Sequence, residues 1–276
     1  MLPPIADQFV AGEDISTALD HTRSLNDDGV GAILNLLGEH YDDAENATAD
    51  TETYIELVEA IAAAELNARI SVKPSQIGLD IGDETFANNL ARIVDRAADA
   101  GVFVWVDMED HTTIDATLDA VIDCAESHSD MGLCVQANMK RTRDDLRRLV
   151  KTPVTARLVK GAYDPPKQLA YKDKADVNRA YRENLAYLFE HADHVAVGSH
   201  DPEMIERAKE LHDEHGTTFE IQMLMGVRGD EQRALASEGY ESYQYVPFGD
   251  KWLSYFYRRV RERKENALFA VRALLS

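Results

Sequence analysis

Charged, amide and phenol side chains recur in this sequence at the ends of short apolar runs. Such groups are costly to bury unless they are paired or used, so their recurrence predicts a polar functional site rather than chance placement. Cations and carboxylates are mixed among these residues, which suits the binding of a small polar molecule. The residues are Glu39, Lys73, Asp107, Glu109, Gln136, Arg157, Lys160, His200, Glu220, Gln222 and Tyr245.

Residue types narrow the chemistry further. His40, His111 and His200 are dispersed and show no His-x-His or His-Glu-x-x-His spacing, so we predict no metal site. Lys160 or Lys73 could form a Schiff base with a carbonyl substrate, as in an aldolase-type barrel. The residue types leave that alternative open, together with a non-catalytic ligand-binding barrel.

The elements that carry these residues alternate between two kinds. Runs rich in Val, Ile and Leu predict eight strands, and segments with helical periodicity follow them. The predicted strands cover 30–37, 69–73, 102–107, 132–136, 154–159, 194–198, 217–222 and 240–246. The predicted helices cover 14–26, 51–66, 85–100, 115–127, 143–149, 176–189, 201–215, 230–238 and 250–274, with Thr85, Asp115, Asp176 and Asp201 as caps.

This alternation predicts an α/β fold, a single distorted (β/α)8 barrel with an extra N-terminal helix and a C-terminal helix over its mouth. A doubly wound sheet is disfavoured because no Gly-rich phosphate fingerprint follows the first strand. No linker is visible, so we expect one domain over residues 1–276. Chemistry in such barrels sits at the carboxyl ends of the strands, where the polar residues fall.

The last predicted helix holds an arginine cluster that runs against the composition of the chain. Arg258 and Arg259 are adjacent, and Glu262 lies four residues after Arg258, in reach of an ion pair. A solvated helix face is one interpretation. Two arginines are also suited to hold a small planar carboxylate through paired donors.

The overall composition excludes several classes of function. The 276 residues are 45% hydrophobic and carry a net charge of −21, so nucleic acid is not an expected partner. Neither a secretory signal nor an apolar run long enough for a membrane span is visible, which favours a cytoplasmic protein. The excess of Asp and the scarcity of Lys resemble proteins from halophiles.

Several motifs, in order, resemble the proline dehydrogenase family over residues 9–273. The specific ones are Arg157-Leu-Val-Lys-Gly-Ala-Tyr163, Phe219-Glu-Ile-Gln222 and Tyr255-x-x-Arg-Arg-x-x-Glu262. Leu37-Gly-Glu39, Lys73-Pro-Ser, Asp107-Met-Glu109 and Gln136-Ala accompany them. The resemblance implies a distorted barrel that holds FAD, with the final helix above the mouth.

For the substrate, the resemblance implies that Arg258 and Arg259 bind the proline carboxylate, with Lys73 near the same group. Tyr245 and Tyr255 would then enclose the pyrrolidine ring against the flavin. These five residues, together with Asp107 and Glu262, are therefore the candidate catalytic residues.

Further roles also follow from the resemblance. Glu262 would hold the arginine pair, Glu39 would gate the entrance, and Asp107 would be an acid near the substrate lysine. Arg157 would lie at the isoalloxazine edge. The residues matched to cofactor contacts are Gln136, Arg157, Val159, Lys160, Gly161, Tyr163, His200, Glu220 and Gln222.

The implied reaction is hydride transfer from C5 of L-proline to flavin N5, which gives Δ1-pyrroline-5-carboxylate. Side chains cannot accept a hydride, so a cofactor is required. Electrons would pass to a quinone, with docking at the inner face of the membrane. A separate pyrroline-5-carboxylate dehydrogenase would act downstream.

Overall fold

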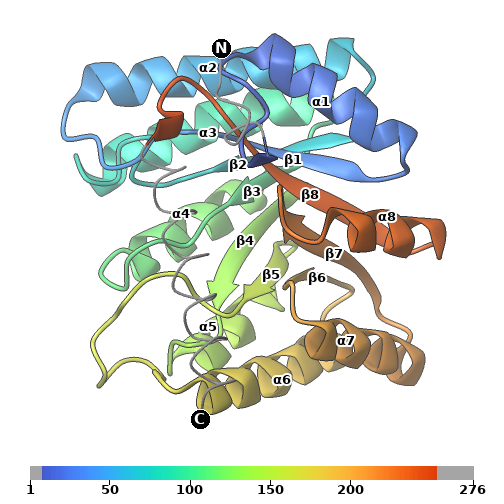
Figure 1. Cartoon of the computed structure of the whole chain (residues 1–276). Coiled ribbons are helices and arrows are strands. Elements are labelled where there is room, and N and C mark those ends of the chain that lie inside the picture. The colour runs from blue at the N-terminus through green and yellow to red at the C-terminus, as the bar shows by residue number, and fades with distance from the viewer. Residues whose placement is uncertain (1–7, 254–276) are drawn as a thin grey trace, which may run out of the picture.

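The computed structural model describes residues 8–253 and shows eight parallel strands closed into a barrel in sequence order (Figure 1). Each strand pairs with the next, and β8 pairs with β1 from Gly31↔Tyr243 to Leu36↔Phe248. The strands are β1 (Gly31–Leu36), β2 (Ala68–Val72), β3 (Val104–Val106), β4 (Met131–Gln136), β5 (Thr155–Val159), β6 (His194–Gly198), β7 (Thr218–Leu224) and β8 (Glu241–Phe248).

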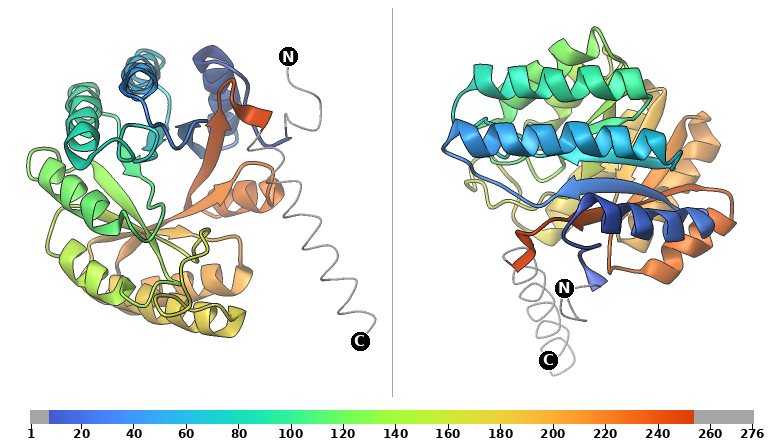
Figure 2. Two further views of the ribbon diagram at one scale, coloured as in Figure 1. Left: turned by 90° about the vertical axis from the view of Figure 1, so that its left-hand side faces the viewer. Right: turned by 90° about the horizontal axis from the view of Figure 1, so that it is seen from above.

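Helices surround this barrel, as the left view of Figure 2 shows. α1 precedes β1, and each later helix connects one strand to the next. The helices are α1 (Ile15–Asp27), α2 (Ala44–Ala63), α3 (Asp83–Ala100), α4 (Ile114–Ala125), α5 (Thr142–Leu149), α6 (Lys174–His191), α7 (Pro202–His215) and α8 (Gly229–Ser237).

The strands are apolar because both of their faces are buried. All residues of β1 and β4 are buried, with alternate side chains packed against helices and turned into the barrel. Inside the barrel, Ile33, Trp105, Ala196 and Tyr243 form a separate apolar cluster. Polar side chains lie beyond this cluster toward both ends of the strands.

The structure confirms the predicted barrel, and its boundaries correct some details. α2 begins at Ala44 instead of residue 51, because the Asp43 carboxylate accepts the Asn46 N–H at 2.8 Å and caps the helix earlier. Of the expected caps, only Asp201 is an N-cap. The other three lie in first turns that begin after Gly82, Thr113 and Asp173.

Most of the helix predicted over 250–274 lies outside the described residues. Within residues 8–253, none of the helices combines the length and the apolar character that crossing a bilayer requires.

Candidate functional site

Asp107 is the centre of a polar cluster at the carboxyl end of the barrel, which we call the mouth. It follows β3 directly, and its Oδ1 accepts the Ser71 hydroxyl at 3.0 Å and an Arg157 guanidinium N–H. Its Oδ2 accepts the Tyr245 hydroxyl at 2.7 Å. One carboxylate therefore joins residues of β2, β5 and β8 to the end of β3.

Arg157 is the buried cation of this cluster and is only 3% exposed. Its guanidinium lies 4.8 Å from the Trp105 ring centroid and donates to Gln222 Oε1 at 3.1 Å. Burial is the largest single influence and opposes the charge, but the Asp107 carboxylate and the other groups around the guanidinium together raise the pKa of Arg157. The guanidinium is thus a fixed positive charge at the base of the mouth.

Gln222 connects this cluster to a second one deeper in the barrel. Its amide N–H donates to Glu220 Oε1 at 2.5 Å, while its oxygen faces Arg157. Glu220 also accepts Arg69 at 2.7 Å and lies 3.3 Å from His194 Nε2. Arg69 and His194 lie at the beginnings of their strands, so Glu220 lies deeper in the barrel than Gln222. Its contact with a cofactor stays a prediction.

This inner cluster is also a group of potential metal ligands within the part of the chain described. His194, Glu220 and Glu241 have ligand atoms within 4.8 Å of one another. Glu220 is already bound by Arg69 through both carboxylate oxygens, at 2.9 and 2.7 Å. Its position at the amino-terminal end of the barrel, together with the Arg69 pair, favours a structural role.

Lys73 follows β2 and is partly exposed at the mouth. Its ammonium donates to Asn35 Oδ1 at 3.2 Å. Asn35 belongs to β1 and is 1% exposed. Lys73 is therefore held at the mouth by a neutral oxygen.

Glu109 follows Asp107 but takes different partners. Its carboxylate accepts the Ser75 N–H at 2.7 Å, the Ser75 hydroxyl at 2.9 Å and the Tyr163 hydroxyl at 3.3 Å. Burial raises the pKa of Glu109, and the bonds from Ser75 only partly offset that effect. The strand predicted over 102–107 included Asp107, but β3 ends at Val106, so neither carboxylate belongs to it.

Gln136, Asn138 and Gly161 line the mouth where β4 and β5 end. Gln136 Oε1 and Asn138 Oδ1 are buried, and neither has a hydrogen-bond partner among the residues described. Gly161 has φ +117°, and a Cβ there would lie 2.3 Å from Asn138 Oδ1. The loop after β5 thus requires glycine and leaves two acceptor oxygens available for a ligand.

Lys160 and His200 lie on the neighbouring loops. The Lys160 ammonium donates to Asp201 at 2.6 Å and to Asn178 at 2.7 Å. Burial opposes ionisation of Asp201, but the bond and charge of Lys160 lower its pKa overall. His200 Nε2 accepts the Leu224 N–H at 2.8 Å. An ammonium paired with a carboxylate is a poor Schiff-base nucleophile, which argues against Lys160 in the aldolase alternative.

Some predicted site residues are not placed by the structure. Tyr255, Arg258, Arg259 and Glu262 lie outside the described residues. Glu39 follows β1 at the mouth and is partly exposed.

Sequence reasoning missed Ser71 and Asn178, which contact Asp107 and Lys160 respectively. Ser71 stands two residues after Arg69 and two before Lys73, so strand alternation places all three on one face. That alternation could have identified Ser71 as a site residue. Asn178 lies in a helix, and no pattern in the sequence marks it as a site residue.

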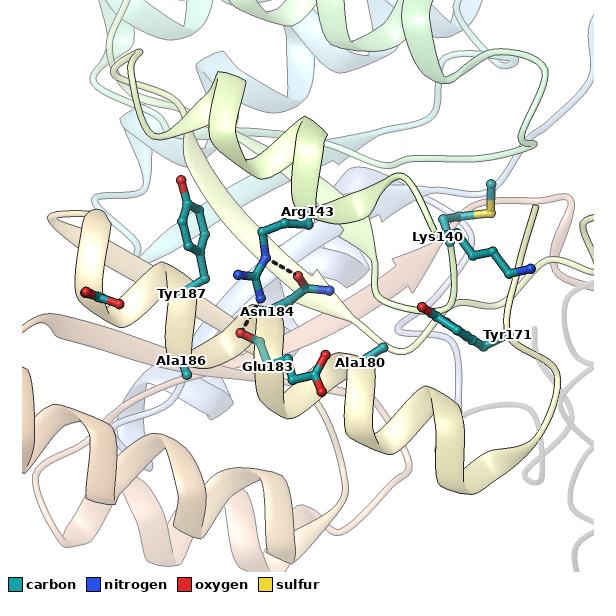
Figure 3. Close-up of a pocket in the computed structure, with 10 residues that line it drawn as sticks. Lys140, Arg143, Tyr171, Ala180, Glu183, Asn184, Ala186 and Tyr187 are labelled. Carbon is teal, nitrogen blue, oxygen red and sulfur yellow. Dashed lines mark hydrogen bonds between the residues drawn. The ribbon is translucent and has the colours of Figure 1, made fainter. Parts of the chain in front are cut away.

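A hollow of about 510 Å³ lies outside the barrel between α5 and α6 (Figure 3). Arg143 crosses it, donating to Asn184 Oδ1 at 2.9 Å and lying 4.6 Å from the Tyr187 ring centroid. Arg143 also donates to the Glu183 carbonyl at 2.6 Å, which occupies its donors within the hollow. None of the residues predicted for the site lines the hollow. We therefore place the candidate site at the mouth.

The fold and the mouth define an α/β barrel with the site layout of a barrel enzyme: charged residues at the carboxyl ends of the strands. The family model for proline dehydrogenase matches residues 18–272. Proline dehydrogenase of Deinococcus radiodurans is 36% identical over 281 residues, covering 98% of this chain and 90% of that protein. Proline dehydrogenase 1 of Bacillus subtilis is 34% identical over 273 residues, with the same two coverages, 98% and 90%. The chain belongs to the proline dehydrogenase family.

Solved structures support the fold. The crystal structure of proline utilization A from Bdellovibrio bacteriovorus, inactivated by N-propargylglycine, superposes with a TM-score of 0.85 at 22% identity. It covers 92% of this chain, which spans 32% of that protein. Proline utilization A of Bradyrhizobium japonicum gives a TM-score of 0.76 at 20% identity. The match covers 95% of this chain and 31% of the Bradyrhizobium chain.

Proposed function

We propose that this chain oxidises L-proline to Δ1-pyrroline-5-carboxylate with FAD as the hydride acceptor. Membership of the proline dehydrogenase family supports proline as the substrate. The observation that carries the proposal is the convergence of Lys73, Asp107, Arg157 and Tyr245 at one end of the barrel.

The residues present fit a flavin. FAD offers hydrogen-bond donors, among them the N3–H of the flavin ring and the ribityl hydroxyls, that the buried, unpartnered Gln136 and Asn138 oxygens can accept. Gly161 lets the backbone after β5 come close to Asn138, as a side chain there would not. Arg157 is a buried cation for the electron-rich edge of the ring system. When bound, FAD would supply the two-electron acceptor that side chains lack.

The other cofactor residues would hold the remainder of the molecule. We propose that Lys160 provides positive charge for phosphate groups from the loop after β5. The 2.6 Å bond from its ammonium to Asp201 fixes the orientation of the Lys160 side chain. The remaining proposed contacts are Val159, Tyr163, His200 and Gln222.

The substrate residues act by binding and orientation. Lys73, with Arg258 and Arg259, would bind the carboxylate of proline and fix the position of C5. Tyr245 would support one face of the ring, because its hydroxyl is anchored on Asp107. Tyr255 would close the other side, Glu262 would hold the arginine pair, and Glu39 would gate the entrance.

The partners follow from the chemistry of the proposed reaction. We propose a quinone as the electron acceptor, reached by peripheral docking of a cytoplasmic protein at the membrane. A separate dehydrogenase would consume the pyrroline carboxylate. We further propose that residues 1–276 form one domain, with Arg258 and Arg259 over the mouth.

An anaerobic titration of the purified protein tests the proposal. L-proline should bleach the visible flavin absorbance, and a pyrroline should appear in stoichiometric amount. D-proline and glycine serve as matched controls. A colourless protein that sodium borohydride traps with a carbonyl compound would instead support the aldolase alternative. A protein with neither property would support the ligand-binding barrel.

A further inference from the structure

Asp50 is the meeting point of three segments at the edge of the mouth. It belongs to α2, and its side chain is 14% exposed. Its Oδ2 accepts the Tyr41 hydroxyl and the Gln76 amide N–H, each at 2.7 Å, and lies 3.9 Å from the Lys251 ammonium. Tyr41 follows β1, Gln76 follows β2 and Lys251 follows β8. One carboxylate oxygen therefore joins the loops after three neighbouring strands to a helix.

Lys251 and Tyr41 contact each other in two ways. The ammonium donates to the Tyr41 hydroxyl, and it lies 4.5 Å from the centroid of the Tyr41 ring. The hydroxyl in turn donates its own hydrogen to Asp50. Burial and the Asp50 carboxylate raise the pKa of Tyr41, so the phenol stays protonated in the physiological range. A neutral hydroxyl thus connects the cation after β8 to the carboxylate of α2.

Residues 38–41, which we call the gate loop, pack directly on this cluster. The loop contains Glu39, the proposed gate. A Cβ at Gly38 would lie 2.4 Å from the Tyr41 hydroxyl oxygen and 2.8 Å from Asp50 Oδ2. His40 has φ 58°, and this left-handed turn brings Tyr41 back against Gly38. The backbone on both sides of Glu39 is therefore placed by contacts to Asp50.

The two ends of the cluster differ in their surroundings. Gln76 is fully buried, and its oxygen accepts the Tyr54 hydroxyl at 3.1 Å, which fixes this end against the barrel. Lys251 is 45% exposed and precedes the Arg258-Arg259 pair in sequence. Exposed ion pairs contribute little to stability, so this end of the cluster calls for another explanation.

We infer that Asp50 is a positioning residue that holds Glu39 at the entrance of the mouth. It binds the gate loop through Tyr41 and, through the same hydroxyl, the chain that leads to the arginine pair. This inference rests on the proposed role of Glu39 as the gate. Loss of Asp50 would release the gate loop, and a bound carboxylate would then leave the mouth faster.

The test measures how fast tetrahydrofuran-2-carboxylate leaves the flavin-loaded protein. This anion has the shape of proline but carries no N–H group to oxidise. Stopped-flow dilution of the complex, followed through the flavin spectrum, gives the dissociation rate. Asp50→Ala should increase this rate about fivefold. The KM for L-proline should rise by a similar factor, while kcat and flavin content stay close to those of the wild type.

A double-mutant cycle separates positioning of the gate from general loosening. Glu39→Gln should itself increase the dissociation rate. Adding Asp50→Ala to Glu39→Gln should change the rate little further, because a residue that acts through Glu39 has no effect once the gate is lost. Tyr41→Phe removes only the hydroxyl that Asp50 and Lys251 share. It should have the same effect in a smaller degree, and it decides the question if Asp50→Ala does not fold.

Tyr240→Phe is the matched control. The Tyr240 ring centroid lies 4.7 Å from the Lys209 ammonium, which also donates to Glu238 at 3.4 Å. The same three kinds of group therefore meet there, but just before β8, at the end of the barrel away from the mouth. This control should leave the dissociation rate and the KM unchanged.

Several outcomes would contradict the inference. Wild-type dissociation rates in both Asp50→Ala and Tyr41→Phe would show that the cluster does not act on the entrance. Additive effects of Asp50→Ala and Glu39→Gln, or an equal increase in Tyr240→Phe, would show general loosening. A wild-type rate in Glu39→Gln would refute the gate. Failure of the wild type to oxidise L-proline would instead overturn the proposed function, and the dissociation rates would still decide the role of Asp50.

Discussion

The Tyr245 hydroxyl donates to Asp107 Oδ2 at 2.7 Å, across the barrel from β8 to the end of β3. Burial and the adjacent Asp107 charge raise the pKa of Tyr245 well above its ordinary value, so the hydroxyl keeps its proton throughout the physiological range. Asp107 Oδ1 accepts hydrogen bonds from Arg157 and Ser71. The Asp107 side chain therefore fixes the position of Tyr245 relative to the buried Arg157 cation.

Asp107→Asn should destabilise the protein strongly. The substitution leaves the Arg157 guanidinium buried without its counter-charge, a change that typically costs about 3–5 kcal/mol. Urea unfolding measures the loss. Asp119→Asn is the matched control, because the Arg148–Asp119 pair of 2.6 Å is exposed and such pairs contribute about 1 kcal/mol or less. Equal losses in the two variants would contradict our view of Asp107 as a buried anchor.

Gly161→Ala should reduce flavin retention. The new Cβ would meet Asn138 Oδ1 at 2.3 Å, and φ of +117° is unfavourable for alanine. Gly216→Ala has a comparable backbone penalty, at φ +75°, but no atom within 4 Å of its Cβ. Flavin content per protein after gel filtration should therefore fall only in Gly161→Ala. Full retention in that variant would remove this loop from the cofactor site.

Glu109→Gln should change the pH dependence of stability. Burial raises the pKa of Glu109, so the unfolded chain releases this proton at a lower pH than the folded protein does. Wild-type stability is thus favoured below the ordinary Glu pKa of about 4.3 and is lost as pH rises through the raised value. The Tm of Glu109→Gln minus that of wild type should become more positive as the pH rises from about 4 to about 7. A constant difference would argue against this assignment.

Arg258→Met and Arg259→Met should raise the KM for L-proline while retaining flavin. In the proposed site, each substitution would remove a charge-assisted hydrogen bond of about 1.5–3 kcal/mol to the substrate carboxylate. Steady-state kinetics and flavin content measure the two effects. Arg263→Met, outside the Arg-Arg-x-x-Glu motif, is the control. Wild-type KM in both variants would show that the motif does not bind substrate.

Stability should increase with salt concentration. The net charge of −21 makes the folded state self-repulsive in dilute buffer. Added salt shortens the screening length from about 10 Å at 0.1 M to about 3 Å at 1 M. Thermal melts in potassium chloride, followed by flavin fluorescence, should shift upward over that range. A flat or falling Tm would refute the predicted halophilic adaptation and leave the reaction unaffected.

The barrel was predictable because its strands are buried on both faces. Each appears as a short apolar run, and the helices between them have their own period. Helix starts were less predictable, since a capping carboxylate such as Asp43 stands among several acids that look alike. Only its bond to the Asn46 N–H distinguishes it.

The sequence allowed us to predict which strands contribute residues to the site, but not how deep in the barrel each side chain lies. Glu220 and Gln222 are two residues apart in β7, so strand alternation places them on one side of the strand. Alternation could not tell which of them reaches the mouth, because height depends on the register with β6, Glu220↔Ala196 and Gln222↔Gly198. The neutral partner of Lys73 was equally hidden, since Asn35 lies in another strand.

The pairing of β8 with β1 has a consequence for how the protein folds. Ile33 pairs with Tyr245, so this seam joins segments more than 200 residues apart in sequence. Contacts of such high sequence separation form late and slow the search for the native state. An intermediate with seven ordered strands would contain Asp107 and Arg157 but not the Tyr245 bond to Asp107. Ligand affinity at the mouth therefore reports completed folding, and it should recover after the signal of secondary structure does.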